Sequence, residues 1–383
     1  MNKRLGIFCF YDVDGIVDRY VEYLLNDINY VLDRLIIVVN GKLSKEGKKL
    51  LYKITDEIVV RENIGFDAGA YADIFVNYLG KNDLLRWDEI IIFNDTFWGP
   101  FISFSDIFNE MENKKVDFWG LNYVDNAFWS YIESYFLVFK HRVVQSNAIY
   151  SYFENILDLT KKEEKYSYLA FEMGIFNSLV DYGYTFDTFS NTKNCSIYYN
   201  CDVCLEKYHL PILKKKSFNK EFFCFERQIY TLKYISLKTD YDITLILEYI
   251  KRKYESPIII KDIINFDISQ YILTEKKIGV PESNVSREKI KMFLNTKKKI
   301  YIYGTGTYAK VIWYGYKEYI RNFGGFVVSD SEWKENEYCC GIMVKKYSDI
   351  ENNRKIILGM GCKNTFYVKE TLGNSNDILA LWK

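Results

Sequence analysis

Apolar runs and helically spaced residues alternate over the first 125 positions of the chain. Short apolar runs bounded by polar residues predict strands at 5–10, 35–40, 57–60, 89–93 and 118–121. Apolar positions within 16–25 fall on one helical face, and Ser44 and Ser105 are predicted to cap two later helices. Strands that alternate with helices indicate an α/β protein with a mainly parallel sheet covered on both faces.

The pattern becomes more helical after residue 125. A strand is predicted at 134–139, and helices are predicted at 148–157, 168–179 and 244–254. Gly183 is expected to end the helix at 168–179, because a glycine readily adopts the left-handed conformation found there.

A second strand–glycine–helix unit follows near the end of the chain. Its strands are predicted at 300–303, 325–328, 355–358 and 378–381. The segment 276–298, rich in charges and helix breakers, suits a linker before it. The predicted division is therefore 1–125, 126–275, the linker 276–298, and a small domain at 299–383.

Composition narrows the class of protein. Of 383 residues, 49% are hydrophobic and 27% are charged, which is ordinary for a globular protein. The 51 basic and 51 acidic side chains balance, so no overall field favours nucleic acid as a partner. No apolar run approaches the roughly 18–20 residues that cross a bilayer, and no leader-like segment opens the sequence. We therefore expect a cytoplasmic protein, in solution or at the inner face of the cell membrane, with its eight cysteines reduced.

Two blocks carry the candidate chemistry. In the first, 61–71, glycines flank Asp67 and lead into a predicted helix, whose N-terminal N–H groups favour phosphate. In the second, 89–100, a buried strand ends on Asn94 and Asp95. An acidic residue at the carboxyl end of a strand suits a Mg²⁺ or Mn²⁺ ion that bridges a diphosphate. Alternatively, Asn94 and Asp95 simply begin a turn.

The order of these blocks resembles the rhamnan synthesis protein F family of bacterial glycosyltransferases. The likeness covers roughly the first 185 residues and runs through 11–21, 38–41, 61–71, 94–100, 117–121 and 134–136. That family looks like a divergent branch of the GT-A glycosyltransferases. The resemblance implies a GT-A-like nucleotide-sugar-binding half at 1–125, and an acceptor half with a helical extension at 126–275.

The resemblance also implies roles for individual residues. Asp95 takes the place of the metal ligand of an Asp-x-Asp motif, with Asn94 in place of the first acidic member. Arg61 either reaches the diphosphate or pairs with an internal carboxylate. The full set implied to bind the donor is Tyr11, Asp12, Asn40, Arg61, Asn63, Gly65, Asp67 and Asn94.

The acceptor half is expected to supply a base. An inverting transfer needs a carboxylate that takes the proton of the acceptor hydroxyl. The resemblance places Glu172 there, near the start of a helix; alternatively it is a first-turn glutamate favoured by the helix dipole. Glu133 is the second candidate for the base. Because the family more often has a glutamine there, the resemblance instead implies an acceptor-binding or structural role for Glu133, and Tyr135 is predicted to bind the acceptor beside it.

Two further motifs have less specific interpretations. Gly304, Gly306 and Ala309 match a dinucleotide-binding loop, with Asp330 where a ribose-binding acid would be, in a Rossmann-like domain. Since the unit is short, we favour a structural or interaction module over NAD binding. The lysines at 214–216 suit either a solvated loop or peripheral contact with an anionic membrane surface.

The sequence thus predicts an inverting rhamnosyltransferase that uses dTDP-L-rhamnose in cell-surface polysaccharide synthesis. Its partners would be the nucleotide-sugar donor and a glycan or lipid-linked oligosaccharide acceptor. Three alternatives stay open. They are a hexosyltransferase using a UDP- or GDP-sugar, a noncatalytic nucleotide-sugar-binding or scaffold subunit, and a nicotinamide-dependent enzyme built on 304–309.

Overall fold

The computed structural model describes residues 2–125, 130–162, 167–254, 258–277, 285–372 and 377–381. These form two compact units. The first comprises Met1–Val124, Ile132–Asp158 and Leu179–Ile278, and the second comprises Asp125–Tyr131, Leu159–Ser178 and Gly279–Lys383. Part of the predicted linker, 278–284, lies outside the described residues.

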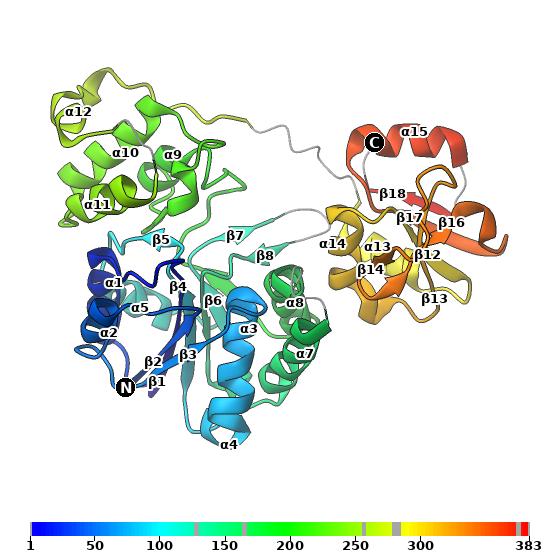
Figure 1. Ribbon diagram of the computed structural model, residues 1–383, viewed down its shortest axis with the longest axis horizontal. Coiled ribbons are helices and arrows are strands. Elements are labelled where there is room, and N and C mark those ends of the chain that lie inside the picture. The colour runs from blue at the N-terminus through cyan, green and yellow to red at the C-terminus, as the bar shows by residue number, and fades with distance from the viewer. Residues whose placement is uncertain are drawn as a thin grey trace. The chain divides into compact units, whose positions relative to one another are not determined.

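A seven-stranded sheet in the order β10-β6-β9-β4-β1-β2-β3 forms the centre of the first unit (Figure 1). Its strands are β1 (Arg4–Phe10), β2 (Arg34–Asn40), β3 (Ile58–Arg61), β4 (Glu89–Asn94), β6 (Phe118–Gly120), β9 (Phe136–Phe139) and β10 (Phe186–Thr188). The predicted strands of this unit are confirmed to within two residues at each end.

Most pairs in this sheet are parallel, as predicted, and β9 is the exception. It runs antiparallel to both β4 and β6. A parallel return needs a long crossover, usually a helix. The described residues between β6 and β9, at 121–125 and 130–135, contain no helix, so the chain returns in the opposite direction.

Helices lie on both sides of this sheet, with α1, α2 and α5 on one side and α3 and α4 on the other (Figure 1). The side chains of α1 and α5 share one buried core with Phe8, Phe93 and Phe136. The helices of the first unit are α1 (Arg19–Asn29), α2 (Lys45–Leu51), α3 (Phe66–Asp73), α4 (Gly80–Leu84), α5 (Phe104–Glu112), α6 (His141–Val144), most of α7 (Ala148–Lys162), α9 (Cys201–Glu206), α10 (Phe225–Lys238), α11 (Thr244–Lys253) and α12 (Ile260–Asn265).

Helix starts were predicted less well than strands. Ser44 caps α2, since its hydroxyl accepts from the Gly47 N–H at 3.0 Å. The predicted cap at Ser105 is wrong. Ser103 caps α5 instead, because its hydroxyl accepts from the Asp106 N–H at 3.1 Å and donates to the Asp106 carboxylate at 2.6 Å.

The second unit contains a five-stranded, all-parallel sheet in the order β16-β13-β12-β17-β18. Its strands are β12 (Lys299–Tyr303), β13 (Phe323–Val328), β16 (Lys345–Lys346), β17 (Arg354–Leu358) and β18 (Ile378–Ala380). Its helices include α13 (Arg287–Leu294), α14 (Thr307–Tyr316) and α15 (Cys362–Leu372), and most of α8 (Ser167–Asp181).

Short two-residue strands complete the structure. They are β5 (Phe97–Trp98), β7 (Tyr123–Val124), β8 (Tyr131–Ile132), β11 (Leu213–Lys214), β14 (Tyr338–Cys339) and β15 (Ile342–Met343). No helix within the described residues is both long enough and apolar enough to cross a bilayer.

Candidate functional site

The carboxyl end of β4 is a sharp polar turn. Every residue of β4 is buried, and the strand ends on Asn94, which is paired with Cys9 of β1. The Asn94 side-chain oxygen accepts from the N–H of Thr96 at 3.2 Å and from its hydroxyl at 2.6 Å. This local turn holds Asp95, only 7% exposed, at the edge of the sheet.

The glycine block meets this turn. Gly65 takes a left-handed conformation before α3, with φ of 75°. On the first turn of α3, Asp67 accepts from the Asn94 amide at 3.0 Å and from the Ala68 N–H at 2.9 Å. Desolvation raises the pKa of Asp67, and these hydrogen bonds oppose that rise. The two sequence blocks therefore form one site, although Asp67 itself occupies an N–H at the start of the helix.

Two consecutive lysines enter the site: Lys215 is the first residue of a short helix, Lys215–Phe218, and Lys214 is the last residue of β11. This strand pairs antiparallel with β5, which places Lys214 opposite Phe97, and the Lys215 N–H donates to the Thr96 carbonyl at 3.1 Å. Lys214 Nζ donates to the Thr96 hydroxyl at 2.6 Å, and Lys215 Nζ donates to Asp95 Oδ2 at 2.9 Å. The prediction of a solvated or membrane-facing run is wrong for both lysines, because they are 6% and 8% exposed; Lys216 alone is exposed.

A third buried acid, Glu133, belongs to this region. Its Oε2 accepts from the Asn122 amide at 2.7 Å and from the Tyr135 hydroxyl at 3.4 Å. Burial raises the pKa of Glu133, and the Asn122 hydrogen bond and the charge of Lys214 work against that rise. Lys214 also lies 4.2 Å above the Tyr135 ring. The predicted acceptor contacts of Glu133 and Tyr135 stay predictions.

The loop after β1 is held by cations of α11. Tyr11 is exposed, whereas Asp12 is 6% exposed and pairs with Arg252 at 3.0 Å and Lys253 at 2.7 Å. The N–H groups of Asp14 and Ile16 also donate to Asp12. Burial raises the pKa of Asp12, but the hydrogen bonds from Lys253 and these N–H groups outweigh it and lower the pKa to about 2.

Arg61 binds other side chains of the first unit. Its guanidinium donates to Asn40 Oδ1 at 2.6 Å and pairs with Asp73 at 3.1 Å, which is the internal role left open by the sequence. Asn40 in turn donates to the Phe66 carbonyl at 2.9 Å, so the pair braces the start of α3. Among the described residues, the buried Oδ1 of Asn63 accepts no hydrogen bond.

Glu172 lies on α8, in the second unit, and is half-buried. The helix begins at Ser167 and its first turn holds no acidic residue, so Glu172 lies in the second turn. The explanation as a first-turn glutamate is therefore wrong. Its role as the base stays a prediction.

The glycine loop of the second unit lines an open cavity of about 720 Å³. Gly304 has φ of +107°, and a side chain there would lie 2.9 Å from the Gly359 carbonyl. Gly359 in turn allows Ala309 of α14 to approach closely, since a Cβ on Gly359 would be 2.7 Å from that of Ala309. Asp330 accepts from the Ser348 N–H at 3.1 Å. Nucleotide binding by Gly304, Gly306 and Ala309 stays a prediction.

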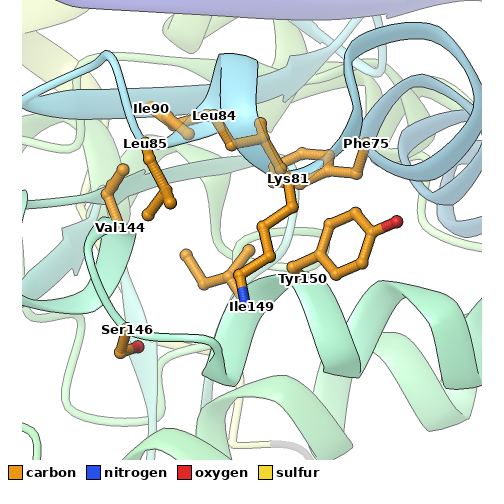
Figure 2. Close-up of a pocket in the computed structure, with 9 residues that line it drawn as sticks. All are labelled: Phe75, Lys81, Leu84, Leu85, Ile90, Val144, Ser146, Ile149 and Tyr150. Atoms are coloured by element: carbon orange, nitrogen blue, oxygen red, sulfur yellow. The ribbon is translucent and has the colours of Figure 1, made fainter.

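A small crevice lies at the other end of β4, beside Ile90 (Figure 2). Leu84, Val144 and Ile149 make it largely apolar, and its volume of about 10 Å³ leaves space for no more than about one water molecule. It is thus separate from the polar turn at Asn94 and has no room for a sugar.

The protein is thus of the α/β class, and its charged and amide side chains gather at the carboxyl end of β4, the edge at which open α/β sheets commonly bind ligands. The sequence pattern of the rhamnan synthesis protein F family matches residues 35–301, and the chain belongs to this family. The predicted resemblance is confirmed and extends further along the chain than 185.

Individual relatives are distant. The virulence protein VirA of Vibrio anguillarum is 29% identical over 181 residues, which are 46% of this chain and 55% of VirA. The chain thus spans about half the length of this curated relative.

Two solved structures are also similar to the chain. A cytidylyltransferase from Leptospira borgpetersenii is 14% identical, with a TM-score of 0.34 over 70% of this chain and 99% of its own. Glucosyl-3-phosphoglycerate synthase from Mycobacterium tuberculosis, solved with Mg²⁺ and UDP, is 10% identical, with a TM-score of 0.20 over 32% and 43%.

Proposed function

We propose that this chain transfers a sugar, with inversion, from a nucleoside diphosphate sugar to a hydroxyl of a bacterial surface glycan. The family favours dTDP-L-rhamnose as the donor. One observation carries the proposal: the carboxyl end of β4 gathers Asp67, Asn94 and Thr96 with the two buried lysines, Lys214 and Lys215. A GT-A-like arrangement of the donor half is part of the proposal.

The donor would lie along the turn at Asn94 and the start of α3. Lys214 and Lys215 provide positive charge for a diphosphate, and buried charge acts more strongly than charge in water. The unsatisfied Asn63 Oδ1 would accept a hydrogen bond from a donor hydroxyl. Tyr11, exposed after β1, would contact the nucleoside.

The acceptor hydroxyl would attack the anomeric carbon from the face opposite the diphosphate. The new C–O bond forms as the bond to the phosphate oxygen breaks, and Glu172 would take the hydroxyl proton. Glu133 and Tyr135 would orient the acceptor. The departing nucleoside diphosphate carries away the electron pair of the broken bond.

The expected divalent ion does not fit the side chains at Asp95. Asp95 Oδ2 already accepts from Lys215 and, at 3.3 Å, from the Tyr20 hydroxyl. The other nearby acid, Asp67, is bonded to the Asn94 amide. In the described parts of the chain, no three His, Cys, Asp or Glu side chains are grouped to hold a metal. We therefore assign no step to a metal.

Donor turnover by purified protein would test the proposed function. dTDP-, UDP- and GDP-sugars would be supplied with a glycan acceptor, and released nucleotide would be measured. We expect one donor to be consumed, and Glu172→Gln to reduce the rate by about 10²–10⁴-fold while still binding that donor. Glu154→Gln, at an exposed glutamate of α7, is the matched control and should keep the wild-type rate.

The other outcomes identify the alternatives. Turnover of a UDP- or GDP-sugar alone would change the donor. Binding without turnover by any donor would favour the scaffold subunit. Binding of NAD(H) alone would favour the nicotinamide-dependent enzyme built on 304–309. Undiminished turnover in Glu172→Gln would show that another group is the base.

A further inference from the structure

The ion pair between Lys215 and Asp95 occupies the place where the sequence predicts a metal. Lys215 Nζ lies 2.9 Å from Asp95 Oδ2 and 2.8 Å from the Tyr20 hydroxyl. Both charged residues are buried. The carboxylate that should bind a cation thus already binds one, supplied by the chain itself.

The position of Lys215 is built by several independent contacts. Its N–H donates to the Thr96 carbonyl at 3.1 Å, and its own carbonyl accepts from the Tyr254 hydroxyl at 3.3 Å. Its ammonium lies 5.1 Å from the Tyr20 ring centroid and 4.7 Å from that of Tyr249, which suits cation–π contact. These contacts fix both the backbone and the ammonium of Lys215, which is not expected of a surface lysine.

A buried ion pair often contributes little to stability, because the cost of desolvating the two charges offsets much of the attraction between them. A divalent ion bound to Asp95 would have to displace the Lys215 ammonium or lie next to it. Two cations in contact with the same buried carboxylate would repel each other strongly. Lys215 donates to Asp95 and Tyr20 within the described residues, which leaves one of its three N–H groups for an anionic ligand.

We propose that Lys215, positioned by Asp95, replaces the divalent cation in this chain, and that donor binding and transfer need no metal. The inference rests on the proposed function. As the bond from the anomeric carbon to the phosphate oxygen breaks, negative charge grows on the diphosphate. The Lys215 ammonium hydrogen-bonds to that oxygen and keeps its own proton. Lys214, bonded to Thr96, adds a second positive charge beside it.

The first experiment uses the wild-type protein. Binding of dTDP, UDP and GDP would be measured by calorimetry in EDTA and again with Mn²⁺ or Mg²⁺, together with donor turnover. We expect Kd and turnover to change by less than about threefold between these conditions. A nucleotide that binds only with metal would overturn the inference but leave the proposed function standing. No nucleotide binding under any condition would overturn both.

The second experiment uses variants in EDTA. Lys215→Met should weaken binding of the nucleotide by at least about tenfold. Lys216→Met removes the same charge from the next residue, which is exposed, and should bind as wild type does. Wild-type affinity in Lys215→Met would overturn the inference.

A double variant guards against misfolding. Lys215→Met alone leaves Asp95 buried without its partner, so the fold itself could fail. Asp95→Asn with Lys215→Met removes both charges and keeps similar side-chain volumes. We expect this protein to melt cooperatively and still to bind nucleotide at least about tenfold more weakly. Wild-type binding by the double variant would overturn the inference.

Discussion

The carboxyl ends of β4 and β12 are the same topological feature with different contents. Each ends a central strand of a largely or wholly parallel sheet. At β4, Asp95 and Asn94 are bonded to Lys215 and Asp67, side chains from other elements. At β12, the glycine turn opens on a cavity of about 720 Å³.

The difference shows what a glycine-rich turn does and does not indicate. Gly304 adopts a positive φ and lies close to the Gly359 carbonyl, and both features are explained by the packing of the second unit. A chemical role requires charged or polar groups fixed around the same point. At β4, Asn94 is hydrogen-bonded to Asp67 and Asp95 is paired with the buried Lys215, which is why the function is proposed there.

The largest expected effect concerns stability at the β4 site. Lys215→Met should lower the free energy of unfolding by about 3–5 kcal/mol, because it leaves the buried Asp95 carboxylate unpaired. Lys334 lines the β12 cavity and is exposed, so Lys334→Met should change stability by less than about 0.5 kcal/mol. Urea unfolding measures both. An equal loss of unfolding free energy in the two variants would contradict the proposed difference between the β4 and β12 ends.

A smaller effect is expected at the β12 turn. Gly304→Ala should destabilise the second unit by about 1–3 kcal/mol, since its φ of +107° and its contact with Gly359 disfavour a side chain. Gly306→Ala should be nearly neutral, because nothing lies within 4 Å of its added Cβ. Thermal unfolding of the two variants tests this contrast. Loss of stability in Gly306→Ala would mean that this part of the loop is also constrained.

The smallest effect is a pH dependence at the first unit. The folded-state pKa of Asp12, about 2, lies below the ordinary value of 3.8. The pairing of Asp12 with Arg252 and Lys253 therefore stabilises the fold above about pH 4. Its contribution of about 1–2 kcal/mol to the free energy of unfolding is lost as the pH falls toward 2. Urea midpoints between pH 6 and pH 2 should fall less steeply in Asp12→Asn. Parallel curves for wild type and variant would contradict the pairing.

Local pattern predicted the strands well and the site only in part. Apolar runs identified β1 to β4, and the end of the run at Asn94 and Asp95 identified the polar turn, because both signals lie within a few residues. The partners of these residues come from far along the chain. Lys215 follows Asp95 by 120 positions, and Arg252 follows Asp12 by 240.

One signal in the sequence could have indicated the lysines. Residues 210–213 are an apolar run that ends on Lys214 and Lys215, just as the β4 run ends on Asn94 and Asp95. Charges directly after a buried strand point to the edge of a sheet as readily when they are basic as when they are acidic. What no local pattern contains is the pairing of β11 with β5, which decides whether those charges face water or Asp95.

That pairing also ties ligand binding to the order in which the chain folds. The strands β1 to β4 are complete by residue 94, yet the lysines that meet Asp95 and Thr96 are synthesised more than a hundred residues later. A nascent sheet would hold acids at its edge with no cations beside them, and would repel a diphosphate. A bound nucleotide would therefore stabilise only chains in which β11 has docked, and its affinity would report that the late part of the fold is in place.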